Sequence, residues 1–579
     1  MINIDSSTNP KAPKCLQCNN CDAIHTSALN DSVSSCPSGI QQCAACITVD
    51  KLKSEVEETM ERLKELLQNL RHAKTEMNQR HSAIFKQLPA EILYSVFESY
   101  VSADPALPRD GFGTFDESCR RKKMARPTVL SQICSQWRQV ALATPRIWTT
   151  VVLVWDVSAE EEIDCVREWI SRTRGFPLDI FIDTSWESLR RSDDWPCPFD
   201  AVRPSFFHLL QAIASTSAQW RYFTAHAPYC VLEYLGQHVK NLGLLEELNI
   251  NRLFSSEVSP HRFWAGSQPA PKSVHLLECS ECSPNKMNVQ WNAVTTIWVA
   301  RITTEECLTL LSSARELITC TIEEIRREDR EERSWHINRP AIKHAKIQNF
   351  TYIEASWLYI FYRLKLPNLK SFTCMWDMWE RFEESEDHDL LLGSMPNMNV
   401  LNISHISNLN PKTLQSALSK VPRTVTQLFL ACDYYSGRES DPRPEILRVF
   451  NQATVTTGSD TDTDANTDGG LPVVLPNLTS LEIRTDATKF PWKDVPKCFA
   501  LPIEDNSAAN QNAPRRRRPL SRFRVTDPSM DKKAQVLIPA DVLKELLVLQ
   551  HKGAEIIFQR EDGDDLLARS IVDAGLEKD

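Results

Sequence analysis

Glycine is scarce in this chain, and the short motifs on which many enzymes depend are missing. Only 15 of the 579 residues are glycine, which disfavours folds that need many glycine turns or a phosphate-cradling loop. The sequence contains no G-x-x-x-x-G-K-[ST], G-x-G-x-x-G, H-E-x-x-H or G-x-S-x-G. We therefore expect no catalytic residues, no enzyme activity in the chain itself and no cofactor for such an activity.

Long apolar runs are missing as well. No stretch of about 18 apolar residues could span a bilayer, and the first fourteen residues are polar, without the apolar core of a signal peptide. We expect an intracellular protein, in the cytoplasm or the nucleus, with reduced cysteines and no membrane partner. The formal net charge of −10 argues against nucleic acid as a partner.

A heptad repeat follows a polar N-terminal segment. Its apolar positions alternate in steps of four and three, which predicts a coiled coil or long amphipathic helix over residues 50–86. They are Leu52, Val56, Thr59, Leu63, Leu66, Leu70, Ala73, Met77 and Ile84. Two interpretations stay open: the helix folds back on its own domain, or it forms a homodimer through residues 52–84.

Two apolar helical segments come next, separated by a polar insert at residues 102–127. The first starts at Leu88-Pro89, with proline in the first turn, where its missing N–H costs nothing. The second runs over 129–143 and ends at Pro145. Each segment has an apolar helix face. Two short helices cannot bury both faces completely against each other, so apolar surface is left for a partner. The residues of the predicted surface are Leu88, Pro89, Ile92, Leu93, Val96, Phe97, Val129, Leu130, Ile133, Cys134, Trp137, Arg138, Ala141, Pro145 and Trp148.

The rest of the chain repeats a short apolar-x-x-apolar-x-apolar pattern. Its clearest copies begin with Pro-Asn, at Pro367, Pro396 and Pro476. The central apolar residues lie mostly 23 to 29 residues apart, the period of leucine-rich repeats, in which each unit supplies one strand and a return segment. These anchors are Leu248, Ile297, Cys320, Ala345, Phe372, Leu401, Leu428 and Leu481, with a degenerate unit near Val274. Unrelated strands of an ordinary α/β domain are the alternative.

Residues 88–148 resemble the F-box, in the F-box-like form of basidiomycete, mushroom-forming fungi. The first helix is similar to the family's L-P-x-E-I-L-x-x-I-F, and the second to V-C-x-x-W-R-x-x-A-x-x-x-P-x-L-W, with Ile147 in place of the usual leucine. The likeness covers about a tenth of the chain, and the insert is longer than in a compact F-box. Such proteins also tend to have a preceding heptad helix and a degenerate leucine-rich-repeat region.

The resemblance implies a function in the ubiquitin-conjugation pathway. The F-box would dock the Skp-type adaptor of a cullin-containing E3 ubiquitin ligase, and the repeats would hold a protein substrate. The chain would act by proximity, since tethering raises the effective concentration of the substrate near the ubiquitin-loaded enzyme. An interaction scaffold without a ligase role, oligomerising through the heptad helix, is the alternative.

The N-terminal segment contains two C-x-x-C pairs, Cys15 with Cys18 and Cys43 with Cys46. Four thiolates at such spacing can hold zinc tetrahedrally. The polar residues between them offer little to pack around a metal, so an unstructured cysteine-rich tail is the alternative.

The expected fold is a mixed α+β and α/β chain with a helical N-terminal part and a repeat solenoid. Its expected parts are a cysteine-rich tail (1–49), the coiled coil (50–86), the F-box-like domain (87–149), the repeat domain (150–560) with disordered loops at 454–470 and 504–519, and a C-terminal tail (561–579).

Overall fold

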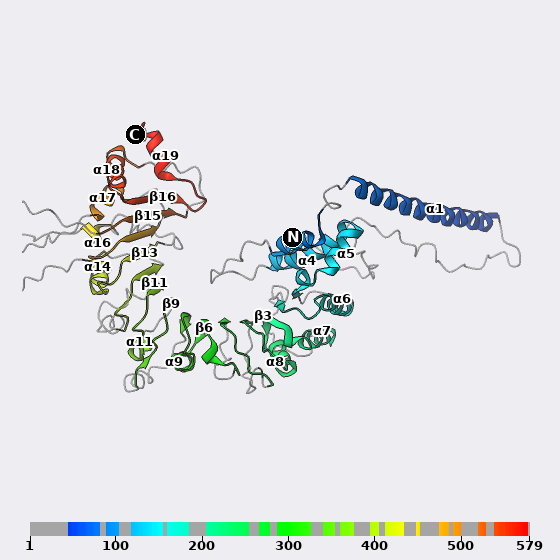
Figure 1. The fold of residues 1–579 in the computed structure, drawn as a ribbon, viewed down its shortest axis with the longest axis horizontal. Helices are drawn as coiled ribbons and strands as arrows, with labels where there is room; N and C mark the ends of the chain where they lie inside the picture. The colour runs from blue at the N-terminus through cyan, green and yellow to red at the C-terminus, as the bar shows by residue number, and fades with distance from the viewer. Residues whose placement is uncertain are drawn as a thin grey trace, which may run out of the picture. The chain divides into compact units, whose positions relative to one another are not determined.

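The protein is described by a computed structural model, which forms two compact units (Figure 1). One holds the chain up to Phe97 together with Val129–Ala141, and the other holds Glu98–Thr128 and Leu142–Asp579. The described residues are 44–81, 88–102, 117–154, 159–183, 204–253, 264, 266–277, 287–325, 340–353, 359–375, 394–404, 411–432, 447–451, 474–485, 490–499, 519–528 and 538–576.

The heptad segment forms one long helix. This helix, α1 (Ala44–His81), begins six residues before the predicted start and continues without a break. Its last predicted seam residue, Ile84, lies outside the described residues. A helix is thus present where the heptads predict one.

The segment that resembles an F-box contains three helices, α3 (Ala90–Ser102), α4 (Glu117–Ile133) and α5 (Ser135–Ala143). The predicted single helix over 129–143 is wrong, because the chain breaks at Cys134. The second half of the predicted insert at 102–127 is helical, since α4 already begins at Glu117 and contains Pro127. Residues 103–116 of the insert lie outside the described residues.

A parallel sheet of fourteen strands runs through the second unit, so the chain forms an α/β, solenoid-like arrangement, as predicted. Each strand pairs with the next one along the chain, apart from two short strands that form a separate pair, β8 (Ile342–Lys343) with β10 (Leu364–Lys365). The fourteen are β1 (Thr150–Val154), β2 (Leu178–Asp183), β3 (Trp220–Pro228), β4 (Glu247–Leu253), β5 (Ser273–Leu277), β6 (Thr296–Ile302), β7 (Thr319–Ile325), β9 (Asn349–Ile353), β11 (Ser371–Met375), β12 (Val400–Ser404), β13 (Gln427–Ala431), β14 (Ser480–Arg484), β15 (Arg522–Asp527) and β16 (Glu555–Arg560).

Two continuous rows of buried side chains form the core of this unit. Because alternate residues of a strand point to opposite faces, residues two apart in every strand fill the same side of the sheet. The first row is Val151, Ile180, Phe223, Leu248, Val274, Ile297, Cys320, Phe350, Phe372, Leu401, Leu428, Leu481, Phe523 and Ile556. The second starts at Leu153 and ends at Phe558, and every member of both rows is buried.

Seven of the eight predicted anchors belong to the first row, and the degenerate unit near Val274 forms β5. The prediction that Ala345 is an anchor is wrong. Ala345 is exposed in a turn, and Phe350 of β9 takes its place in the row. The aromatic alternation of Phe350 and Tyr352 marks the real strand, and both side chains are buried.

The helices of this unit connect successive strands and contact their neighbours along the chain, as α6 with α7, α7 with α8, and α17 with α18 do. Figure 1 shows them following the sheet along its length. They are α6 (Ala159–Arg172), α7 (Pro204–Ala214), α8 (Tyr229–His238), α9 (Thr304–Ser313), α11 (Tyr359–Arg363), α14 (Pro411–Lys420), α16 (Arg448–Asn451), α17 (Val495–Cys498), α18 (Ala540–His551) and α19 (Leu566–Asp573), with 3-10 turns η2 (Pro145–Trp148), η5 (Ser217–Gln219), η7 (Trp291–Ala293) and η10 (Trp492–Asp494).

The Pro-Asn motifs bind neighbouring repeats together. Asn368 donates its amide to the carbonyl of Ala345 at 2.7 Å, and Asn397 donates to that of Pro367 at the same distance. Asn477 donates to the carbonyl of Arg423 at 2.9 Å. Each amide therefore fastens the turn before its own strand to the corresponding turn of the preceding repeat.

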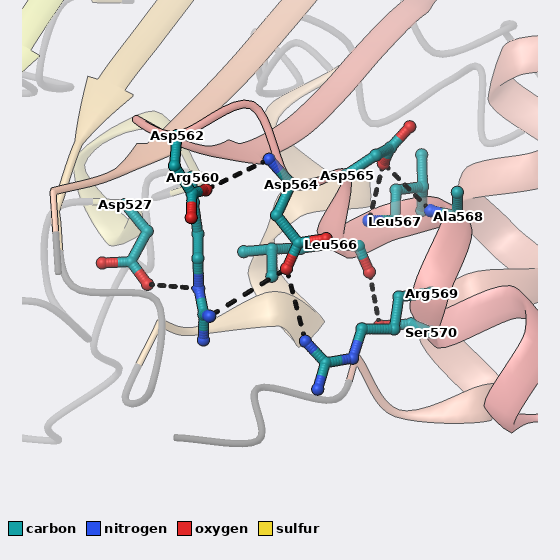
Figure 2. A network of polar contacts seen from close by, with 10 residues as sticks. All are labelled: Asp527, Arg560, Asp562, Asp564, Asp565, Leu566, Leu567, Ala568, Arg569 and Ser570. Carbon is teal, nitrogen blue, oxygen red and sulfur yellow. Dashed lines mark hydrogen bonds and ion pairs between the residues drawn. The ribbon is translucent and has the colours of Figure 1, made fainter. Parts of the chain in front are cut away.

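The C-terminal residues end the sheet with a helix, so the predicted tail at 561–579 is wrong for the part described. Arg560 of β16 lies between Asp527 and Asp564, and Arg569 of α19 reaches Asp564 as well (Figure 2). Asp565 caps α19 by accepting hydrogen bonds from two backbone N–H groups. The predicted loop at 454–470 lies outside the described residues, and so do residues 504–518 of the second loop.

Candidate functional site

The three helices α3, α4 and α5 divide the predicted docking residues into a buried and an exposed group. Leu93, Phe97, Leu130 and Ala141 are buried, as is Trp148 in η2. Leu88, Cys134, Trp137 and Pro145 are half-buried. The exposed members are Pro89, Ile92, Val96, Val129, Ile133 and Arg138.

Contacts of the predicted docking residues hold the first unit together. The indole of Trp137 packs on the ring of Phe97, with 4.9 Å between ring centroids. Two N–H groups of the first turn of α3, those of Ile92 and Leu93, donate to the carbonyl of Pro89. At the break between α4 and α5, the guanidinium of Arg138 donates to the carbonyl of Ser131 at 2.9 Å. These residues therefore shape the surface from below.

Four branched apolar side chains of α3 and α4 are exposed. Ile92 and Val96 are one turn apart on α3, and Val129 and Ile133 are one turn apart on α4, so each pair shares a helix face. They are 47%, 48%, 47% and 49% exposed. We call these four residues the α3–α4 patch; branched apolar side chains at such exposure on two helices of one unit are typical of a partner-binding surface.

Trp148 does not belong to a docking surface. It is fully buried in the second unit, where it packs edge-on against Trp169 at 4.7 Å between centroids and lies under the guanidinium of Arg172. The indole N–H of Trp169 donates to the backbone carbonyl of Trp148 at 2.7 Å. The end of the predicted motif thus begins the core of the repeat sheet.

The sheet offers a second surface, opposite its helix-covered rows. From Asn249 in β4 onward, the residues between the two buried rows are all partly exposed. Charged pairs border this surface. One guanidinium nitrogen of Arg221 donates to both carboxylate oxygens of Asp179, at 2.9 and 3.0 Å. Arg522 pairs with Glu555, and Arg524 pairs with Glu482.

The central strands of this surface carry no charge in the middle row. Strands β9 to β13 present Thr351, Thr373, Asn402 and Phe429 there, and the amide of Asn402 donates to the hydroxyl of Thr373 at 3.0 Å. We call these four residues the neutral band. Hydroxyl and amide groups at this density suit hydrogen bonding to the backbone of a peptide. Sequence reasoning located the strands but did not identify this surface, although period-two alternation around the anchors contains it.

Cys307 and Cys320 are buried thiols of the repeat region. Burial raises the pKa of Cys307 well above its ordinary value, and burial likewise raises the pKa of Cys320, so both stay protonated near neutral pH. Burial also raises the pKa of the Tyr352 hydroxyl beside them. These groups lie inside the sheet and helix layers and face no exposed surface.

The predicted zinc ligands are mostly outside the described residues. Cys15, Cys18 and Cys43 are not described, and Cys46 lies in the first turn of α1. Across the described ranges, no group of histidine, cysteine and carboxylate side chains could hold a metal ion. Among the described helices, none is long and apolar enough to cross a membrane.

Comparisons with known proteins add little beyond this geometry. No family model matches the chain, and neither does any curated protein. Among solved structures, it is similar to the leucine-rich repeat-containing protein LegL7 from Legionella pneumophila, at 12% identity and a TM-score of 0.30, over 58% of this chain and 98% of that chain. A TM-score this low carries no argument, so the solenoid-like arrangement rests on the strand order and register alone.

Proposed function

We propose that this chain is the substrate-receptor subunit of a Skp–cullin–F-box type ubiquitin ligase. In this proposal α3, α4 and α5 are an F-box-like module that docks the Skp-type adaptor. The parallel sheet is a degenerate leucine-rich-repeat-like array whose open face holds a protein substrate. The chain does no chemistry itself and acts by holding the substrate near the ubiquitin-loaded enzyme.

The α3–α4 patch carries the proposal. Ile92, Val96 and Ile133 coincide with apolar positions of the F-box pattern and Val129 lies one turn before Ile133, yet the four contribute little to the core of their own unit. Because exposed branched apolar side chains are costly to hydrate, a surface that keeps four of them about half exposed on two helices is best explained by a partner that covers them. The sequence resemblance supports a Skp-type adaptor as this partner.

Single substitutions at the α3–α4 patch test adaptor docking. Ile92→Asp or Val129→Asp places a carboxylate in the proposed interface, and we expect a loss of adaptor affinity of about 30-fold or more, as for a central interface residue. The matched control is Gln139→Asp, which adds the same charge at an exposed polar position of α5. Binding of the purified full chain to recombinant adaptor is measured by calorimetry.

Thermal melting of each variant separates lost docking from lost folding. Ile92 and Val129 are exposed, so both variants keep the melting temperature of the parent, whereas Trp137→Ala lowers it by removing the contact with Phe97. Adaptor binding that persists in Ile92→Asp and Val129→Asp contradicts the proposal. Absence of binding by the parent chain contradicts it too, and leaves the interaction scaffold as the alternative.

The second half of the proposal concerns the substrate. Affinity purification with the parent and the doubly substituted Ile92→Asp, Val129→Asp chain, followed by mass spectrometry, compares their partners. We expect the adaptor and cullin to be lost from the variant while the substrate remains bound to the sheet. A substrate that disappears together with the adaptor contradicts this division of roles.

A further inference from the structure

The long helix α1 keeps its entire apolar seam exposed. Its large apolar side chains are between 44% and 58% exposed over the described length, so no other described segment of the chain covers them. The seam residues are Val49, Leu52, Val56, Leu63, Leu66, Leu70 and Met77. The first interpretation of the heptads, a helix folded back on its own domain, therefore has no support in the structure.

The kind of residue at each heptad position indicates the partner. Steps of seven place Val49, Val56, Leu63, Leu70 and Met77 at position a, and Leu52, Thr59, Leu66 and Ala73 at position d. In the first heptads, Val49 and Val56 at position a combine with Leu52 at position d, a combination that favours two parallel strands over larger assemblies; from Leu63 onward position a holds leucine and methionine. The one hydroxyl in this seam, on Thr59, donates to the carbonyl of Glu55 in its own helix, so a partner need not satisfy it.

Charges beside the seam distinguish the two possible orientations. Glu55 and Glu76 occupy position g, and Lys53 and Lys74 occupy position e. An antiparallel pair in which Leu52 of one helix faces Met77 of the other would bring Glu55 near Glu76, and Lys53 near Lys74. Both contacts are repulsive.

The parallel arrangement avoids these contacts. There a g residue faces the e residue five positions later in the second helix, so Glu55 meets Met60, Arg62 meets Leu67, and Asn69 meets Lys74. None of these pairs joins like charges. The like-charge contacts thus disfavour the antiparallel orientation more strongly than any charge pair stabilises the parallel one. Charges commonly select among coiled-coil pairings in this way.

We propose that α1 binds a second copy of this chain as a parallel, in-register, two-stranded coiled coil about 57 Å long. This pairing would place two copies of the α3–α4 patch and two repeat sheets in one assembly. It follows from α1 alone and does not depend on the ligase proposal, since a scaffold without an adaptor would pair in the same way.

The first experiment measures the mass of the full chain in solution. Sedimentation equilibrium is run on the parent, on Leu63→Glu with Leu70→Glu, and on Ser54→Glu with Gln68→Glu. Both variants add two negative charges to α1, but only the first alters position a, because Ser54 and Gln68 lie on the outer face at position f. We expect the parent and the outer-face variant to be dimers. The dissociation constant of the seam variant should be at least 100-fold higher than that of the parent.

The second experiment fixes the orientation. A photo-crosslinking amino acid replaces Leu52, and isotopically heavy and light chains are mixed before irradiation. Parallel pairing gives crosslinks from residue 52 to the neighbourhood of residue 52 in the other copy. Crosslinks to the neighbourhood of Met77 overturn the orientation, while a monomeric parent, or a seam variant that dimerises like the parent, overturns the proposal as a whole.

Discussion

A single arginine connects the last two strands with the terminal helix. The side chain of Arg560 is 3% exposed, and its guanidinium lies 3.9 Å from the carboxylates of both Asp527 and Asp564. Asp527 is fully buried. Taking one charge from a buried pair leaves the other in a medium that solvates it poorly, which usually costs more than the pair contributes.

Replacing this arginine should therefore destabilise the sheet. We expect Arg560→Met to lower the free energy of unfolding by about 3 kcal/mol, measured by urea denaturation of the full chain. The matched control is Arg569→Met, since Arg569 pairs with the same Asp564 from a partly exposed position and should cost about 1 kcal/mol or less. Equal effects of the two substitutions would show that burial of the Arg560 pair is not the cause.

Among the elements, the turns before the strands carry the regular inter-repeat contact. The amide of Asn397 bridges to the carbonyl of Pro367, and the hydroxyl of Thr424 donates to the carbonyl of Met398 at 2.7 Å, so the chain of contacts continues from β11 to β13. A bond between neighbouring repeats should matter for stability, since each repeat of a solenoid is held mainly by its neighbours.

Removing one of these amides tests their contribution. We expect Asn397→Ala to lower the free energy of unfolding by about 1 kcal/mol, the usual net value of one hydrogen bond. Asn399→Ala is the control, because Asn399 is exposed two residues later in the same turn. Its backbone N–H and carbonyl form hydrogen bonds with the neighbouring repeats, and the substitution keeps both groups. Chemical denaturation of both variants measures the difference, and equal midpoints would argue that the Asn397 bond contributes nothing.

The elements also show how far sequence reasoning reaches in this chain. A buried apolar pair two residues apart, such as Leu401 and Ile403, identifies a strand because both side chains must enter the core. Ala345 satisfied the same local pattern but lies in a turn, because a pattern of apolar spacing cannot tell a strand from the segment leading into it. The break at Cys134 was missed for a related reason: apolar periodicity continues from α4 into α5 although the backbone does not.

The predicted docking residues show the same limit. The pattern selected both Ile92 and Leu93, yet Ile92 is exposed and Leu93 is buried. A helical stripe wider than one row contains residues for the core and residues for a partner, and only packing assigns each side chain to one of them. The neutral band could not be found in this way, since threonine and asparagine between apolar anchors give no periodic signal of their own.

At the scale of the whole molecule, the repeat sheet has two ends that need protection. An open sheet edge exposes unpaired backbone groups and apolar side chains, and terminal repeats of solenoids normally cover them. Here β16 and α19 end the sheet, with Phe558 fully buried and α19 packed on β16. Residues Phe523 and Val525 of β15 would lie at the edge without them.

Truncation after Pro528 should therefore expose that edge. We expect the shortened chain to lose at least 10 °C in melting temperature and to aggregate on heating, because Phe523 loses its contact with Phe558, whose rings lie 6.0 Å apart. The matched control ends at Gly575, which keeps Arg560, α18 and α19 and removes only the last residues. Calorimetry with light scattering measures both chains. A sheet that melts and stays dispersed equally well without β16 would mean that each repeat is stable on its inner neighbour alone, and that the terminal helix serves a purpose other than closing the core.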